Sequence, residues 1–492
     1  MFPLVSLTLF LPLVGAATLI VLSGLRRLTP RAAYVIGIVI TALTLLGVVG
    51  VWLRGVGSTF SQVDEVAWIP SLGASYRVGV DGISLALAML TALLFLVALI
   101  FSSSLTERPG SYVALFLLLE TSCLGVFLAL DMVLFYVFWE VSLVAMYFII
   151  DGWGHAGRQR AALTFFLYTL LGSLPLLLAI LALYLGSNPH TFDIRSLVAS
   201  PPLSGLAATL TLVALLIAFA IKIPVFPFHT WLPAAHVEAS TAGSVVLAGV
   251  LLKLGTYGLI RFALEMTPDA FRQAAPAVAV IAVFSALYGA LVALAQNDLK
   301  RMVAYTSVNH MGYVVLGVAA AAAAVDPRAR TLAIDGAVLQ MISHGVVTGA
   351  LFLLVGMLQD RTVTREMGAF GGLLRVTPIL GWSFILAAFA SLGLPGLAHF
   401  PAEFQIFLGT FQVWPIAAAI TVVGIVITAG LYLRAIQATF FGVVPERWVH
   451  LPDLGHREAW TIVPLLVLIV MLGVAPRALL DVIHRTVELI AS

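Results

Sequence analysis

Residues 221–261 read IKIPVFPFHTWLPAAHVEASTAGSVVLAGVLLKLGTYGLIR, and their pattern of charge and proline decides the fold class. Lys222 ends a long run of uncharged residues, and Lys253 stands alone in the apolar run that follows. The sequence therefore predicts two ammonium groups at membrane depth. A charge there costs at least about 2.5 kcal/mol, so such residues are usually paired or lined by water, and functional.

Three prolines between the two lysines predict that the spanning helix is interrupted. Pro224, Pro227 and Pro233 each remove a backbone donor, so a helix that reaches Lys222 cannot continue unbroken. Non-helical backbone at membrane depth is tolerated where it is buried in protein or lines a cavity. A broken helix beside buried charges is typical of a transporter site.

The composition favours an integral membrane protein. Of the 492 residues, 61% are hydrophobic and only 10% are charged, whereas soluble domains carry about 25% charged residues. The single cysteine, Cys123, excludes an internal disulfide and leaves no CxxC motif for zinc or an iron–sulfur cluster. The sequence contains no P-loop and no dinucleotide fingerprint, and no basic run indicates nucleic acid.

Apolar runs of spanning length predict an all-α polytopic membrane protein with about fourteen transmembrane helices. An even number places both termini on one side, and the lysine and arginine bias of the loops favours the outside. The runs are residues 2–24, 33–53, 81–101, 112–130, 132–150, 161–185, 205–229, 241–260, 274–295, 302–324, 332–358, 378–410, 416–440 and 460–473.

The quoted stretch resembles the signature of the antiporter-like membrane subunits of proton-pumping NADH:quinone oxidoreductase, respiratory complex I. This family is shared with Mrp-type cation/proton antiporters and membrane-bound hydrogenases. Two positions depart from the usual pattern: Ala234 replaces a common Asp, and Ser240 replaces a common Pro. Neither change touches a lysine.

The resemblance implies a multi-pass subunit of the bacterial inner membrane that moves protons while other subunits transfer electrons. Its expected partners are the other membrane-arm subunits, including homologous antiporter-like chains, together with lipid, protons and water. FMN and iron–sulfur clusters are expected on partner subunits and no cofactor or metal on this chain.

The resemblance also implies two inverted five-helix repeats, with discontinuous seventh and twelfth helices. A second proline-rich break, SLGLPGLAHFPAEFQIF, precedes and contains Glu403 and echoes the break at Lys222. The expected divisions are 1–110 for the first three spans, 111–265 and 266–442 for the repeats, and 443–492 for the last span.

Glu140 is the only charge in residues 132–150 and lies near the middle of that run. Its best partner is an ammonium at equal depth, and the resemblance implies a switchable pair with Lys222. The alternative is a static buried ion pair, which stabilises weakly. Lys253 would be the middle relay, unless it extends to the interface.

Glu403 stands where M-type chains of the family carry glutamate and the L and N types carry lysine, so the resemblance implies a proton exit group there. A glutamate that faces a loop is the alternative. His310 and His344 lie between Lys253 and Glu403 in the chain and could hold a water wire, although a packing role is equally typical of a buried histidine. Glu120 matches another family position and could tune Glu140 or serve an input route.

Other interpretations remain open at this stage. His229, His236 and Glu238 invite a metal site, but Pro233 interrupts their spacing. The chain could instead belong to an Mrp-type sodium/proton antiporter or a hydrogenase complex, because these share the lysines and Glu140. It could also be an anchoring scaffold, in which case charge-neutral variants would assemble and pump normally.

Overall fold

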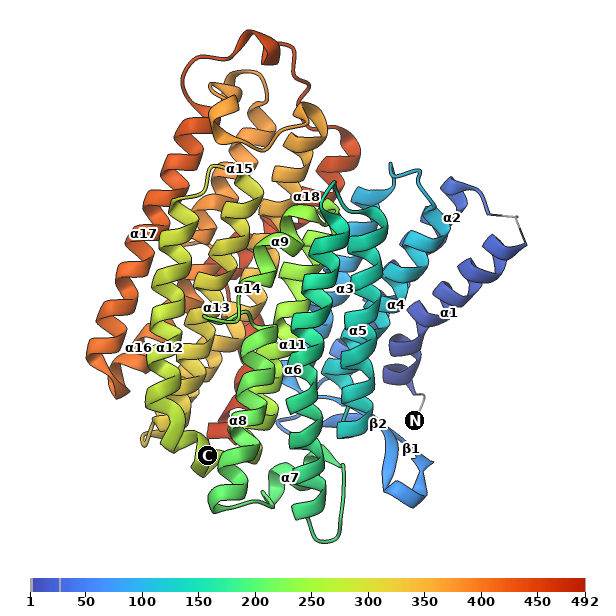
Figure 1. Cartoon of the computed structure of the whole chain (residues 1–492), viewed down its shortest axis with the longest axis vertical. Helices are drawn as coiled ribbons and strands as arrows, with labels where there is room; N and C mark the ends of the chain where they lie inside the picture. The colour runs from blue at the N-terminus through green and yellow to red at the C-terminus, as the bar shows by residue number, and fades with distance from the viewer. Residues whose placement is uncertain (1–2, 26–27, 492) are drawn as a thin grey trace.

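Long apolar helices packed side by side make up the chain (Figure 1). The computed structural model describes residues 3–25 and 28–491, so the predicted start at Phe2 lies outside the described part. Twelve described helical segments are long and apolar enough to cross a membrane. They are α1 (Leu4–Gly24), α2 (Pro30–Leu53), α3 (Gly82–Ser102), α4 (Pro109–Leu128), α5 (Met132–Trp153), α6 (Arg158–Gly186), α8 (Gly205–Lys222), the segment Thr241–Leu264, α12 (Pro268–Leu294), α14 (Pro327–Thr362), α17 (Pro415–Phe440) and α18 (His456–Val474).

Two further helices are not among these twelve because of their composition or length. α13 (Leu299–Ala323) is buried over nearly its whole length but carries polar residues, and α15 (Pro378–Ser391) is short. The membrane-spanning helical fold predicted from the sequence is thus confirmed, whereas the count of fourteen spans and the repeat boundaries remain predictions.

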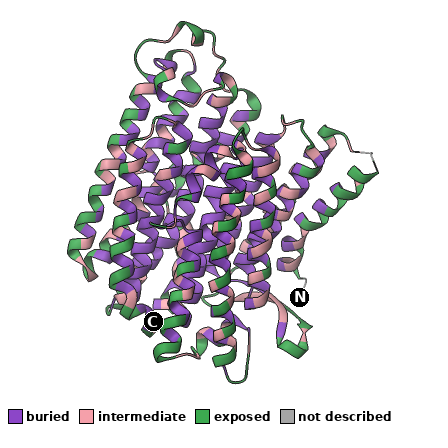
Figure 2. Cartoon of the chain, in the orientation of Figure 1, coloured by how far each residue is buried: buried purple, intermediate pink, exposed green. Residues whose placement is uncertain are grey.

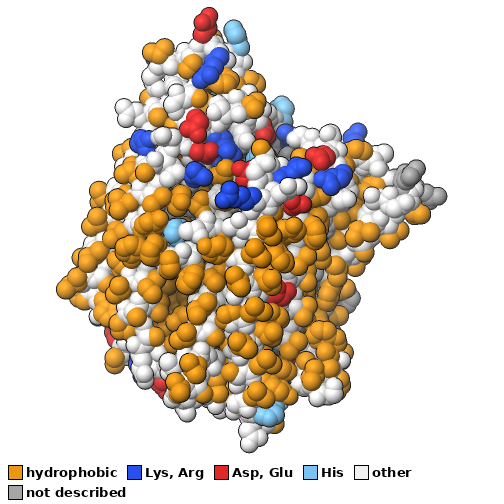
Figure 3. All heavy atoms as spheres, in the orientation of Figure 1, with side chains coloured by type: hydrophobic (Ala, Val, Ile, Leu, Met, Phe, Trp, Pro, Cys, Tyr) orange, Lys and Arg blue, Asp and Glu red, His pale blue; other side chains and the backbone are white. Residues whose placement is uncertain are grey.

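Burial separates a protein core from a lipid-facing surface. The spanning stretches of α14 and of Thr241–Leu264 are wholly buried, whereas α1, α2 and α18 leave most of theirs uncovered (Figure 2). The uncovered side chains are apolar, for example Val14 on α1 and Leu46 on α2, which are 60% and 63% exposed. Figure 3 shows a broad hydrophobic surface below a band rich in charged side chains. Apolar side chains facing outward over this height fit a bilayer.

The first break follows Lys222, as the prolines predict. α8 ends at this residue, and the chain stays non-helical until α9 (Trp231–Glu238). Trp231 fastens the two pieces together, because its indole Nε1 donates a hydrogen bond of 3.0 Å to the carbonyl of Ile221. The break is therefore a built feature that is buried in protein at its start, from Ile223 to Val225, and exposed at Pro227 and Thr230.

The helix that carries Lys253 alternates between α and π turns. α10 (Thr241–Val246) runs into the π segment η2 (Leu247–Leu251), then α11 (Leu252–Gly258), then a second π segment, η3 (Leu259–Leu264). Widened turns of this kind are rare and frequently occur at functional sites.

The second break separates α15 from α16 (His399–Val413). Gly393 and Gly396 in the connection have φ angles of 78° and 90°, a left-handed conformation that glycine adopts without strain. Both predicted interruptions are therefore present in the structure.

The structure adds three elements that the sequence analysis did not predict. β1 (Ser61–Ile69) and β2 (Ala74–Val80) pair as an antiparallel hairpin, so the chain is not purely α-helical. α7 (Ile194–Ala199) is a short helix near them. α19 (Arg477–Ala491) follows α18, packs on α3 and α14, and does not qualify as a span.

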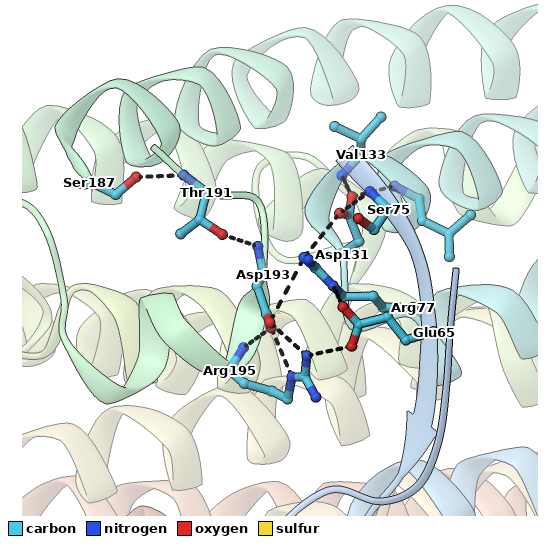
Figure 4. Close-up of polar contacts among 10 residues, drawn as sticks. Glu65, Ser75, Arg77, Asp131, Val133, Ser187, Thr191, Asp193 and Arg195 are labelled. Carbon is cyan, nitrogen blue, oxygen red and sulfur yellow. Dashed lines mark hydrogen bonds and ion pairs between the residues drawn. The ribbon is translucent and has the colours of Figure 1, made fainter. Parts of the chain in front are cut away.

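An ionic cluster ties the hairpin to the start of α5 (Figure 4). Arg77 contacts Glu65 at 2.6 Å, and Arg195 contacts Glu65 at 3.1 Å and Asp193 at 2.7 Å. The Asp131 side chain caps α5 by accepting from the amides of residues 133 and 134, and it also accepts from Ser75 at 2.9 Å. The cluster thereby fixes where α5 begins and so the depth at which its side chains lie.

Candidate functional site

Lys222 and Glu140 do not form the ion pair that the sequence analysis predicts. The Lys222 ammonium is 2% exposed and has no hydrogen-bond partner, and one oxygen of the half-buried Glu140 carboxylate also has none. Among the described residues, no ion pair joins them. The Lys222 Nζ lies instead 4.9 Å from the centre of the Trp139 ring.

Trp139, the neighbour of Glu140 on α5, thus lies beside Lys222 where the Glu140 carboxylate was expected. An indole face attracts a cation through its negative quadrupole, an interaction worth about 2 kcal/mol when desolvated. This is less than a close carboxylate supplies at the same burial. The structure therefore shows the pair in a separated arrangement.

Lys253 is fully buried and tightly held. Its Nζ donates a hydrogen bond of 2.5 Å to the carbonyl of Ala248 and lies 2.7 Å from Nδ1 of His344. Ala248 belongs to the first π turn, five residues before the lysine. Because the ammonium has only donors, His344 Nδ1 must be an acceptor here. The sequence analysis placed His344 between Lys253 and Glu403 only in chain order, and the structure adds a direct contact between Lys253 and His344.

A chain of hydroxyl groups orients His310 on α13. Tyr432 donates to Thr306 at 3.4 Å, and Ser391 donates to Tyr432 at 2.8 Å. The Ser391 oxygen is then the acceptor for His310 Nε2, 3.1 Å away. In the neutral imidazole, this assignment leaves the lone pair on Nδ1.

Glu403 lies where that lone pair points. Its Oε1 is 3.3 Å from His310 Nδ1, and Gln340 on α14 donates to the same oxygen at 3.4 Å. The carboxylate is 3% exposed, so it faces the core, and the alternative of a loop-facing glutamate is wrong. The ring centres of His310 and His344 are 5.7 Å apart, which leaves one short gap between Lys253 and Glu403.

Glu120 on α4 is fully buried, and neither carboxylate oxygen has a hydrogen-bond partner. Among the described residues, no hydrogen bond or ion pair joins Glu120 to Glu140 or Lys222. Its burial fits a proton-carrying group better than a surface charge, because an unpaired buried carboxylate is costly. Its tuning or input role remains a prediction.

The sequence analysis missed two buried polar residues near this chain of groups, His399 and Lys300, and considered a third, His236, only as a metal ligand. His399 lies four residues before Glu403 on α16, with its Nδ1 3.8 Å from the Glu403 carboxylate. The four-residue spacing is the signal that could have identified it. Lys300 is fully buried and donates to the carbonyl of Ala239 at 2.6 Å, and His236 is buried with both ring nitrogens unpartnered.

The metal site considered at His229, His236 and Glu238 does not assemble. His236 stacks on Phe352 with 4.6 Å between ring centres, and Glu238 accepts from the amide of Gly157 at 2.7 Å. Within residues 3–25 and 28–491, the group of three donors close enough to share a metal is instead His310, His399 and Glu403.

Comparisons with known proteins agree over nearly the whole chain. A family model described as "NADH:quinone oxidoreductase/Mrp antiporter, TM" matches residues 129–428. A relative from Rickettsia prowazekii named NADH-quinone oxidoreductase subunit M is 38% identical over 99% of this chain and 98% of its own. A relative of the same name from Rhodobacter capsulatus is 40% identical over 98% and 95%.

Solved structures share the fold. A chain of respiratory complex I from Thermus thermophilus superposes with a TM-score of 0.89 at 32% identity, covering 99% of both chains. A chain of the Mrp complex from Dietzia gives 0.87 at 24% identity over 100% and 98%, a likeness that concerns the fold alone.

Proposed function

We propose, since the chain belongs to the NADH:quinone oxidoreductase and Mrp antiporter membrane family, that it is a proton-translocating subunit in the membrane arm of an NADH:quinone oxidoreductase. The observation that carries the proposal is the buried series Lys253, His344, His310 and Glu403. Adjacent members lie 2.7 Å and 3.3 Å apart at its two ends. The series consists of groups that exchange protons, and it crosses the middle of the bundle.

The first step loads Lys222. Its ammonium faces only an aromatic ring in the observed arrangement, so approach of the Glu140 carboxylate would stabilise its charged form and withdrawal would release the proton. Moving one charge against 150 to 200 mV costs about 3.5 to 4.6 kcal/mol. Making and breaking one buried contact between opposite charges is of that size.

The following steps pass the proton along the series. Lys253 can hand a proton to His344, whose Nδ1 already accepts its hydrogen bond. His310 takes this proton on its Nδ1 lone pair and becomes an imidazolium while Nε2–H stays on Ser391, and the Nδ1 proton then passes to the carboxylate of Glu403, the exit group. A water in the gap between the two histidines would complete the wire, because histidine serves as a proton shuttle near neutral pH.

Several finer points belong to the same proposal. The two repeats span 111–265 and 266–442, FMN and iron–sulfur clusters reside on partner subunits, and the translocase activity belongs to the assembled complex. The chain lies in a bacterial inner membrane with both termini outside. The marked chain ends lie toward one end of the bundle in Figure 1, and in Figure 3 lysine and arginine side chains gather toward the other.

The test is Lys222→Ala in the assembled complex, with electron transfer and proton pumping measured side by side in membranes. We expect pumping to fall at least about tenfold, together with NADH:quinone activity, because one obligatory carrier is lost. Arg477→Ala removes one positive charge from a side chain that is 90% exposed and serves as the control. Normal pumping by assembled Lys222→Ala overturns the relay. Intact NADH oxidation with lost sodium extrusion favours the antiporter.

A further inference from the structure

We propose that His310, His399 and Glu403 form a binding site for a divalent transition metal such as Zn²⁺, and that the bound ion blocks proton exit. The three side chains come from two elements, α13 and α16, which pack against each other. Two imidazoles and one carboxylate are a donor set that zinc prefers, with a fourth position open to water. The blocking effect rests on the proposed function, whereas the binding does not.

The geometry needs little change to hold the ion. One donor atom from each residue lies within 4.8 Å of the others, and the two histidines approach the same carboxylate oxygen at 3.3 and 3.8 Å. Donors bound at about 2.0–2.2 Å around a tetrahedral zinc ion lie about 3.3–3.5 Å apart. Closing the widest separation therefore takes a shift of up to about 1.5 Å, within the reach of rotating side chains.

The surroundings prepare these donors for a metal. The hydroxyl chain through Ser391 and Tyr432 holds His310 Nε2 and leaves Nδ1 free as a ligand. Nδ1 of His310 is buried and has no hydrogen-bond partner. The His399 Nδ1, which lies 3.8 Å from Glu403, is also 3.3 Å from the carbonyl oxygen of Ser391, so it binds a metal once it releases that contact and its proton moves to the unpartnered Nε2. Gln340 holds the Glu403 carboxylate at 3.4 Å. Outer contacts of this kind fix ligand orientation and contribute substantially to metal affinity.

Occupancy stops the relay in two ways. The ion takes the Nδ1 lone pair and the carboxylate oxygen between which a proton would pass. It also places two positive charges beyond His344, whose other side accepts the hydrogen bond of Lys253. An ammonium on Lys253 is then disfavoured by repulsion in a weakly screened interior.

Burial predicts slow entry. His310, His399 and Glu403 are 1%, 0% and 3% exposed, so an ion reaches them only when the helices around them move apart. Inhibition should therefore develop over time and be relieved slowly by a chelator, unlike inhibition at a surface site.

The test uses the purified complex in proteoliposomes, titrated with ZnCl₂ while proton pumping is recorded, and compares parent with His399→Asn. His399 has no role in the proposed relay. Each variant is referred to its own zinc-free rate. The control is His484→Asn, because His484 contacts Asp335 at 2.6 Å and Glu488 at 3.2 Å and offers zinc a partly exposed alternative. Zinc per complex is counted after removal of loosely bound metal.

We expect His399→Asn to raise the zinc concentration for half-inhibition at least about tenfold and to bind about one zinc ion fewer, because one ligand in three is lost. His484→Asn should leave half-inhibition unchanged. Equal zinc content in parent and His399→Asn overturns the site. One ion fewer without any change in inhibition retains the site and overturns the block, and with it the exit role of Glu403.

Discussion

The two broken helices place a charged group at membrane depth in opposite ways. After α8, the Lys222 ammonium has an aromatic ring and no hydrogen bond. After α15, Glu403 has Gln340 and two histidines within 3.8 Å. An under-satisfied buried charge is costly and easily moved, whereas a satisfied one is held. The first break is therefore suited to switching and the second to holding a proton.

Lys253 lies between these two regions, and its replacement should stop proton transfer from the first to the second. We expect Lys253→Met to reduce proton pumping at least about tenfold, because the methionine cannot carry a proton to His344. The measurement is pumping in proteoliposomes at equal complex content. Lys253→Arg keeps the charge but does not release protons in proteins, so it should fail as well. Pumping by either variant at the parental rate would contradict the series.

The ring of Trp139, which contacts Lys222, tests whether the first break depends on a weakly held ammonium. Trp139→Phe should weaken the cation–π contact by about 1 kcal/mol, which changes pumping by about fivefold. Trp153→Phe is the matched control, because Trp153 also lies under a cation, Arg108 at 4.8 Å, but at the end of α5. Equal effects of both variants on pumping would show that ring size in α5, and not the contact with Lys222, matters.

The ionic cluster at the start of α5 holds the helix that carries Glu140. Its loss should have the smallest effect of the changes considered. Hydrogen bonds from Arg77 and Arg195 hold the pKa of the Glu65 carboxyl below its ordinary value. Because the folded pKa is lowered, the stabilisation is complete above about pH 4.5 and fades as the pH falls below it. It amounts to less than about 1 kcal/mol, as for other surface ion pairs.

Glu65→Gln should slightly lower the thermal unfolding midpoint of the purified complex at pH 7, and the difference from the parent should close toward pH 3. Glu107→Gln is the control, because Glu107 is similarly exposed and pairs only with its neighbour Arg108 at 3.2 Å. A gap that persists at pH 3 would show that the loss is one of packing and not of charge.

Much of this arrangement follows from the sequence because membranes impose strong rules. Apolar length located the spans, and proline located both interruptions. The missing ion pair between Glu140 and Lys222 was not predictable, because a pair that switches has two arrangements and the sequence does not say which is at rest. The hairpin was not predicted because buried and exposed side chains do not alternate along strand β1. Its burial is set by the ionic cluster and not by a hydrophobic core. His399 escaped because its importance depends on α13, which lies far away in the chain.

The helix α19 has a consequence for how the chain is made. The Thr486 hydroxyl in this helix accepts a hydrogen bond from the amide of Gly82 at the start of α3, 404 residues away in the chain. The Asp81 carboxylate beside it holds the buried Arg261. During synthesis, the Gly82 amide therefore stays without this partner until α19 has been made and docks on α3. The hydrogen bonding at the start of an early helix is thus finished by a helix from the other end of the described chain.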